Sequence, residues 1–385
     1  MELNLFENTW DIISPGLIFL AGFFFAYCLG RIFSTTAKRS YLLYLWHTLW
    51  CMAYLIFTLT NGGDALGYYF DGLSGLVDFS FGTEAIKWFT HFFAYQLQLS
   101  YVSCFLIFNF VGLIGFICFD SILQSVIKNR SLFIQQLGAL IIFLPSISFW
   151  SSAIGKDAFS FSSAVLVLWA SLDLKHRVFA MIFAILLMLF VRPHIAALIL
   201  LSLLINSLFD NRLKLITRLI FLVATVIGLV YLLPFATEYA GVDNLKDTSD
   251  AIEFIELKQS YNQDGGGGID ISKLSLPAQL FSYLFRPSLF DIKSFLSFFA
   301  AIDNLVLLVI IYYALIGFAK GYRLSKNLPV TFYLAYITIC WLVLAVTTAN
   351  LGISIRQKWM FLPSLLYISF CLAGRIKSPT KNLVR

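Results

Sequence analysis

The sequence predicts an all-α fold: a polytopic bundle of about eleven transmembrane helices that forms a single domain over residues 1–385. Hydrophobic residues make up 59% of the chain and charged residues only 12%, whereas soluble domains carry roughly 25% charged residues. The apolar runs are about 14 to 22 residues long, near the length that crosses a hydrocarbon core of roughly 30 Å. Charged residues gather in the gaps between these runs, which we therefore interpret as loops.

Eleven apolar runs qualify as spans. They cover residues 12–30, 41–60, 99–119, 131–150, 157–172, 178–191, 195–209, 214–234, 298–318, 328–348 and 357–373. The first run has acids before it and cations after it, the reverse of a signal peptide, so we interpret it as a retained helix. An odd number of spans places the two ends of the chain on opposite sides.

The cations divide unevenly between the two sides of this topology. Most of the 27 Lys and Arg fall in alternate loops, together with only the acids Asp120, Asp173 and Asp210. The positive-inside rule makes that side cytoplasmic, with the N-terminus outside and the C-terminus cytoplasmic. The basic balance of the chain thus reflects topology, and we expect no nucleic-acid partner.

The first outer loop, 61–98, begins with Asn61-Gly62-Gly63-Asp64. Because glycine adds no bulk, the carboxylate of Asp64 can approach a substrate closely, bind a sugar hydroxyl or accept its proton. The plain alternative is a solvated aspartate in a tight turn.

Two short outer turns carry further charges. Lys156 and Asp157 begin the fifth span, where helix N-terminal amides favour an anion; a local ion pair, or a helix cap by Asp157, is the alternative. Arg192-Pro193-His194 forms the tip of a tight hairpin between the sixth and seventh spans. An ionisable group at the membrane edge is costly unless it is paired or hydrated, although an ordinary turn with a snorkelling arginine also fits.

The second long outer loop, 235–297, is acidic in its first half and contains four consecutive glycines at 265–268. This run predicts a flexible hinge, because it lacks the preceding strand and the following Lys-Ser/Thr of a phosphate-binding loop. Residues 281–297 mix aromatic and aliphatic side chains with Arg286 and Lys293, which predicts an amphipathic helix at the outer interface. Arg286 then lies at head-group depth.

Arg356 and Lys358 lie at the outer end of the last span, on the side where the positive-inside rule disfavours cations. A bound anion explains them better than topology does. Together with Arg192 and Lys156 they are expected to face one cavity at the outer leaflet. Arginine gives bidentate contacts to phosphate and lysine a point-charge contact, so a lipid diphosphate fits these cations.

The six cysteines predict no special chemistry. Each lies within a predicted span and none forms a CxxC pair, so helix packing explains them. The first outer loop has no DxD motif. We therefore expect no metal and no other cofactor.

These features together resemble the integral-membrane glycosyltransferases of the GT-C type, and among them the bacterial polymerases of O-antigen and capsule repeat units. The resemblance rests on the span pattern, the loop from Asn61 to Asp64, the segment 149–157, the Arg192 turn and the run from Arg356 to Trp359. It implies a reaction at the outer face of the bacterial cytoplasmic (inner) membrane. There an undecaprenyl-diphosphate-linked glycan donates its reducing end to a hydroxyl of a second lipid-linked glycan.

The resemblance also implies roles for the charged residues. The diphosphate and glycan ligands would be Lys156, Arg192, Arg286, Arg356 and Lys358. Asp64 would activate or orient the acceptor. The second acid or base stays open between Asp157 and His194, since an imidazole titrates near the working pH.

The partners implied are the lipid-linked donor and acceptor, membrane lipids and a chain-length regulator. One alternative keeps the fold but adds a single sugar from a polyprenyl-phosphate-sugar donor. Another is a lipid-glycan flippase or transporter, which needs ionisable residues along a path across the bilayer. Few ionisable residues fall at mid-span, and His47 and Asp303 are the nearest candidates, which argues against transport.

Overall fold

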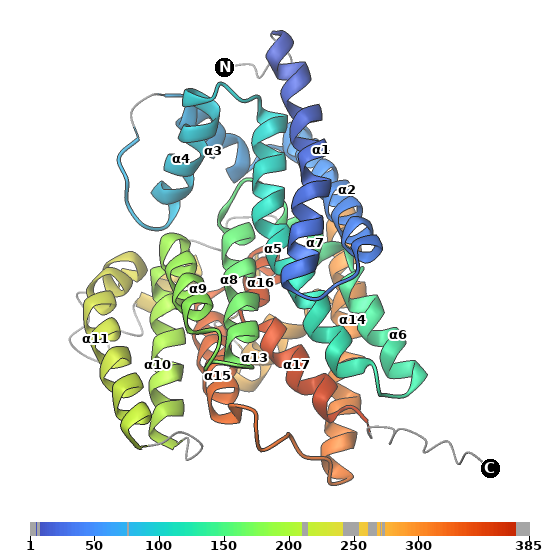
Figure 1. Ribbon diagram of the computed structural model, residues 1–385, viewed down its shortest axis with the longest axis vertical. Helices are drawn as coiled ribbons and strands as arrows, with labels where there is room; N and C mark the ends of the chain where they lie inside the picture. Colours follow the sequence, from blue (N-terminus) through green and yellow to red (C-terminus); the bar gives the residue numbers. More distant parts are fainter. Residues whose placement is uncertain are drawn as a thin grey trace.

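The computed structural model describes residues 5, 8–74, 77–209, 215–241, 254–260, 268–269, 271 and 274–374, most of which are helical (Figure 1). The α-helices are α1 (Thr9–Ile32), α2 (Ala37–Asn61), α3 (Asp64–Leu73), α4 (Thr83–His91), α5 (Tyr101–Ile127), α6 (Leu132–Ile142), α7 (Pro145–Ser151), α8 (Lys156–Ser171), α9 (Val178–Val191), α10 (Pro193–Phe209), α11 (Leu215–Ala240), α13 (Leu276–Phe285), α14 (Phe295–Ala319), α15 (Val330–Thr347), α16 (Leu351–Gln357) and α17 (Leu362–Leu372). A π-helical turn follows α4 at Phe92–Gln96, and a 3₁₀ turn follows α16 at Lys358–Met360. Within these described ranges the only β pairing is an isolated bridge between Gly268 and Asn350.

Seven helical segments in the described part of the chain are long and apolar enough to cross a membrane. They are Thr9–Ile32, Ala37–Asn61, Tyr101–Ile127, Leu132–Ser151, Arg218–Tyr239, Phe295–Ala319 and Val330–Thr347. Three shorter apolar helices are Val178–Val191, Pro193–Phe209 and Leu362–Leu372. The prediction of an all-helical membrane protein is thus confirmed, while the number of eleven spans stays a prediction.

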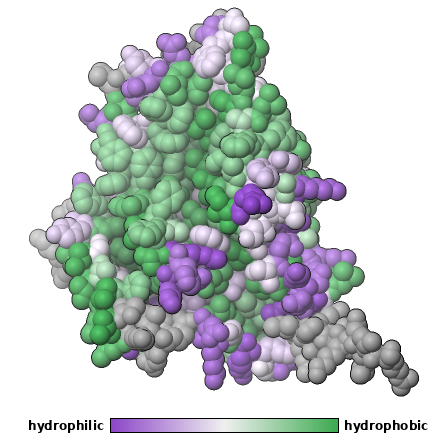
Figure 2. Space-filling model, in the orientation of Figure 1, coloured by the Kyte–Doolittle hydropathy of each residue, from purple (hydrophilic) through white to green (hydrophobic). Residues whose placement is uncertain are grey.

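Many large apolar side chains are exposed on the surface of the bundle. Phe24 on α1 and Tyr231 on α11 are about three-quarters exposed, at 74% and 75%, among many large apolar neighbours. Figure 2 shows green, hydrophobic side chains over much of the upper surface and purple, hydrophilic ones mainly in the lower part. An apolar surface of this extent is unfavourable in water and suited to a hydrocarbon environment.

Helix α5 lies at the centre of the first half of the bundle, in contact with α1, α2 and α8. Small residues permit this close packing. A Cβ atom at Gly112 would lie 1.8 Å from the carbonyl oxygen of Ser151, and the backbone N–H of Gly115 donates to the hydroxyl of Ser162 over 3.1 Å. Helices α7 and α8 are therefore held directly against α5.

The second half of the bundle is built around α10, which packs against α11, α9 and α15 (Figure 1). Helix α8 contacts both α5 and α9 and so joins the two halves. The N-terminus of α8 and the turn between α9 and α10 are thereby brought to the same end of the bundle.

Prolines set two helix boundaries that matter for the site. Pro145 begins α7 and divides the expected span 131–150 into α6 and α7. Pro193 begins α10 directly after Arg192. Proline lacks the N–H needed inside a helix but is accommodated in its first turn.

The helix expected over 281–297 is wrong in its bounds. Helix α13 runs instead from Leu276 to Phe285, with a proline in its first turn. Residues 286–294 are not helical, because Pro287 cannot continue the helix. Helix α14 then starts at Phe295 after a capping box made by Ser294 and Ser297.

The described residues of the segment 61–98, which was predicted to be the first outer loop, are partly helical. The segment contains α3 and α4, which an ion pair of 3.1 Å between Lys87 and Asp71 joins; Lys87 also pairs with Glu84 within α4 over 2.8 Å. The backbone N–H of Gly82 donates to the carbonyl of Phe190 at the end of α9 over 2.9 Å. These contacts tie α3 and α4 to the end of α9.

Candidate functional site

Charged residues from four separate parts of the sequence line one cavity of about 160 Å³, which we call the polar pocket. Its charged residues are Asp64, Lys156, Asp157, Arg192 and Arg356, and its aromatic ones are Tyr54, Tyr68 and Trp150. Of the four cations expected to face one cavity, Lys156, Arg192 and Arg356 line it and Lys358 does not. Of the eight candidate site residues, five line this pocket. The other three, His194, Arg286 and Lys358, lie elsewhere.

Asp64 reaches the polar pocket because of the turn that precedes it. Gly62 and Gly63 have φ of 72° and 129°, values that favour glycine, and they reverse the chain between α2 and α3. Asp64 is the first residue of α3 and its side chain is 65% exposed. Its Oδ2 lies 3.6 Å from Nη1 of Arg356. The carboxylate is thus open to an incoming group while remaining beside a cation.

Arg356 enters the pocket from α16, a short helix capped by the side chain of Asn350. Its guanidinium carbon lies 5.1 Å from the ring centroid of Trp150, within the range of a cation–π contact. The flat ring orients the guanidinium, and Asp64 neutralises part of its charge. An incoming phosphate can replace Asp64 at this guanidinium and form a bidentate contact.

Arg192 and Asp157 form the buried side of the pocket. Nη2 of Arg192 donates to Oδ1 of Asp157 over 2.8 Å, with side chains 10% and 18% exposed. Among the described residues Nε of Arg192 is buried without a hydrogen-bond partner. An unpaired buried donor is costly, so the arginine retains a donor for a ligand.

Lys156 is the third cation of the polar pocket. Its Nζ donates to the hydroxyl of Thr83 over 3.0 Å and to that of Tyr239 over 3.4 Å. Both partners are neutral oxygens, which leaves the positive charge of Lys156 uncompensated by an acid in direct contact. Burial, helped by the nearby Asp64, raises the pKa of Tyr68 above its usual value, so this phenol stays neutral and able to donate.

Lys358 does not line the polar pocket, contrary to the expected diphosphate contact. It is 3% exposed, and its Nζ donates to Oδ1 of Asn304 and, over 3.4 Å, to the carbonyl of Leu284. It shares a small void with Asp303. The 3₁₀ turn after α16 points Lys358 in a different direction from Arg356. Lys358 is therefore buried in the interior, whereas Arg356, two residues earlier, lines the polar pocket.

Arg286 also lies outside the polar pocket. It donates to Asp291 through Nε over 3.0 Å and through Nη2 over 2.5 Å. Its position is the non-helical turn between α13 and α14, where Pro287 has ended the helix. Arg286 instead borders a second, larger cavity.

His194 is not among the residues that line the polar pocket. Its ring stacks on Tyr239 with centroids 5.5 Å apart and planes 12° apart. Burial, together with the cations Arg192, Lys156 and Lys258, lowers the pKa of His194 to about 3. The imidazole is therefore neutral at physiological pH, and it packs on the same Tyr239 whose hydroxyl accepts from Lys156.

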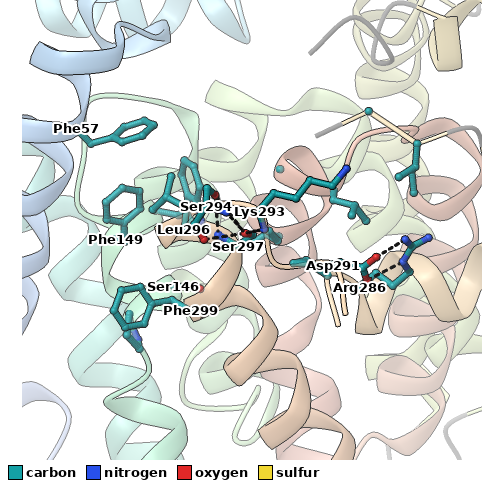
Figure 3. A pocket seen from close by; sticks show the side chains of 18 of the residues that line it. Phe57, Ser146, Phe149, Arg286, Asp291, Lys293, Ser294, Leu296, Ser297 and Phe299 are labelled. Atoms are coloured by element: carbon teal, nitrogen blue, oxygen red, sulfur yellow. Dashed lines mark hydrogen bonds and ion pairs between the residues drawn. The ribbon is translucent and has the colours of Figure 1, made fainter. Parts of the chain in front are cut away.

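The larger cavity has a volume of about 500 Å³, and we call it the aromatic cavity. Its wall includes Trp50, Phe57, Phe149 and Phe299, and its rim includes Arg286 and Lys293. Figure 3 shows the aromatic rings on one side and Lys293, Arg286 and Asp291 on the other. Trp150 borders both this cavity and the polar pocket. An apolar space therefore adjoins a charged one.

Several residues of the two cavities were not singled out from the sequence. Thr83 and Tyr239 orient Lys156, and Tyr54 lines the polar pocket. With 18 Tyr and 40 Phe in the chain, aromatic residues carry little positional signal. Phe149 and Trp150 did belong to the marked segment 149–157, although no role was assigned to either ring.

No family model matches the chain, and no curated protein or solved structure does either. Across the described residues, no group of three or more His, Cys, Asp or Glu side chains is arranged to hold a metal ion. What the site can do must therefore be argued from its own geometry. It offers three cations for an anion, an exposed carboxylate for a hydroxyl, and an adjoining apolar cavity for a chain.

Proposed function

We propose that this protein is a membrane glycosyltransferase that polymerises lipid-diphosphate-linked oligosaccharides at the outer face of a bacterial inner membrane. The observation that carries the proposal is the convergence of Lys156, Arg192 and Arg356 with Asp64 in one pocket beside a large apolar cavity. Substrates suited to such a pair of neighbouring cavities are amphiphiles with phosphorylated, hydroxyl-rich heads. The GT-C resemblance of the charged segments supports the same class.

The bond changes follow from this substrate. The oxygen of an acceptor hydroxyl bonds to the anomeric carbon of the donor glycan, and the bond from that carbon to the diphosphate oxygen breaks. The lipid diphosphate leaves with the bonding electron pair, and the hydroxyl proton passes to a base. Cations fixed in place before the reaction stabilise the charge that develops on the leaving group.

Asp64 is the better candidate for the base. Its carboxylate is 65% exposed and 3.6 Å from Arg356, whereas Asp157 accepts a 2.8 Å hydrogen bond from the buried Arg192. A carboxylate that serves as base must reach the hydroxyl within hydrogen-bond distance. Asp157 instead holds Arg192 in position, and His194 lies outside the pocket.

The test is deletion of the gene in its host, with complementation by wild type, Asp64→Asn or Arg356→Ala. Surface glycans are separated by gel electrophoresis. We expect a long ladder with wild type, and a lipid core with one repeat unit for the deletion and both variants. An intact ladder lacking one sugar would instead support a single-sugar transferase, and lipid-linked units retained at the inner leaflet would support a flippase.

Insertion must be checked alongside the gel. Arg323→Ala is the matched control, because Arg323 also lies over an aromatic ring, 4.7 Å from the centroid of Phe318, but at the opposite end of α14 from the site. Normal ladders for Arg323→Ala and for both pocket variants, at equal membrane abundance, would contradict the proposal.

A further inference from the structure

Helix α16 separates the two cavities. Leu351, Gly352 and Ile355 border the aromatic cavity, while Ile353 and Arg356 border the polar pocket. The alternation follows from helical periodicity, which directs residues three or four apart to the same side. The two cavities are therefore neighbours that share Trp150 and otherwise have different linings.

The aromatic cavity has the chemistry of a chain-binding site. Its rings come from three helices: Trp50 lies 5.4 Å from Phe299 and Phe57 lies 5.9 Å from Phe149, measured between centroids. A volume of about 500 Å³ falls in the range of roughly 300–1,000 Å³ found for small-molecule sites. Flat rings around an apolar space suit a branched hydrocarbon chain.

The rim of this cavity carries its own uncompensated cation. Arg286 is neutralised by Asp291 at 2.5 Å, and the hydrogen bonds from Arg286 hold the pKa of Asp291 well below its usual value, so this acid stays ionised. Lys293, two residues further, is exposed and has no ion-pair partner in the described part of the chain. Figure 3 shows its side chain extending along the rim.

We propose that the aromatic cavity binds a second isoprenoid phosphate, with its chain against the aromatic wall and its phosphate on Lys293, while the first occupies the polar pocket. This rests on the proposed function, in which two lipid-linked substrates meet. The site at Lys293 then takes the carrier lipid of the acceptor glycan. Two phosphates repel each other unless each has its own cation, and Lys293 and Arg356 lie in different cavities.

The test counts bound ligands on the purified full-length protein in detergent by native mass spectrometry, with farnesyl phosphate as the probe. We expect wild type to bind two molecules and Lys293→Glu to bind one. Arg356→Glu is also expected to bind one. Lys320→Glu, at the opposite end of α14 from Lys293, is the matched control and keeps two.

The affinities of the protein for two related probes distinguish contacts to the head group from contacts to the chain. Farnesol, which lacks the phosphate, should bind the aromatic cavity equally well in wild type and Lys293→Glu, whereas farnesyl phosphate should lose about tenfold or more in Lys293→Glu because a charge-assisted contact is reversed. Lys293 is exposed, so the change spares folding.

The outcomes are distinct. One molecule bound to wild type and none to Arg356→Glu would mean that a single amphiphile spans both cavities, which overturns the proposal. Two molecules bound to Lys293→Glu at unchanged affinity would overturn it as well. Two-site binding with normal glycan ladders for Arg356→Ala would leave the second lipid site standing and remove the polymerase function, so the two failures can be told apart.

Discussion

Arg192 and Asp157 form a hydrogen-bonded ion pair of 2.8 Å that joins the turn before α10 to the first turn of α8. The two halves of the bundle meet at this pair, and both residues line the polar pocket. Because the pair is mostly buried, each charge depends on the other. Asp157 thus supports Arg192, which in the proposed reaction contacts the substrate through its remaining donors.

Removal of one partner of this ion pair should therefore destabilise the protein far more than removal of both charges. Asp157→Ala leaves Arg192 buried without its acid, and we expect it to lower the free energy of unfolding by roughly 3 kcal/mol. The double variant Asp157→Asn with Arg192→Gln should recover much of that loss and remain inactive. Thermal unfolding in detergent measures the stability. Equal stability of wild type and Asp157→Ala would contradict a buried, mutually dependent pair.

Arg356 should be sensitive even to the conservative change to lysine. A lysine keeps the positive charge beside Asp64 but cannot make a bidentate contact or stack on Trp150 as a plane. We expect Arg356→Lys to lower polymerisation in isolated membranes by about tenfold or more, and Arg323→Lys to leave it unchanged. Full activity of Arg356→Lys would show that only charge is needed at this position.

The charged clusters show how far the sequence could predict the site. That charges from distant loops would meet was predictable, because topology places them at one end of the bundle. Which of them face the pocket was not predictable, because Arg356 and Lys358 are only two residues apart, yet Arg356 lines the polar pocket and the 3₁₀ turn places Lys358 in the interior. The aromatic cavity was hidden for another reason: its rings come from α2, α7 and α14, and nothing in their spacing marks them among so many aromatic residues.

His194 predicts a specific pH dependence. Its pKa is lowered to about 3 in the folded state, against roughly 6.5 in an unfolded chain. A group whose folded pKa is depressed in this way takes up its proton in the unfolded state first, so stability falls as pH drops from about 6.5 towards 3.

His194→Phe should abolish much of this slope while keeping the stack on Tyr239. Thermal unfolding between pH 7 and pH 4 is the measurement, and parallel curves for wild type and variant would refute the assignment. Because His194 lies outside the polar pocket, polymerisation by His194→Phe at neutral pH should stay within about threefold of wild type. Complete loss would restore His194 as a candidate base.

Gly112 tests the close packing that positions Trp150. A methyl group there would lie 1.8 Å from the carbonyl oxygen of Ser151, and backbone cannot move aside cheaply. We expect Gly112→Ala to lower the free energy of unfolding by about 1–3 kcal/mol. Gly16→Ala on α1, where no atom lies within 4 Å of the added carbon, is the matched control and should be neutral or slightly stabilising. If both variants lost the same free energy of unfolding, the cause would be helix propensity and not packing against Ser151.

Variants of Lys358 distinguish a structural role for this residue from a role in substrate binding. Its ammonium is buried against Asn304 and shares a void with Asp303, so Lys358→Met alone leaves a buried acid without its cation and should destabilise the protein by roughly 3 kcal/mol or more. Lys358→Met with Asp303→Leu removes both charges and should restore stability. If Lys358 is an anchor, the double variant also polymerises glycan, because Arg356, Arg192 and Asp64 remain in place. A stable double variant with no activity, at normal membrane abundance, would contradict the purely structural role of Lys358. Lys358 would then have to contact the substrate, which requires the 3₁₀ turn to rearrange when substrate binds.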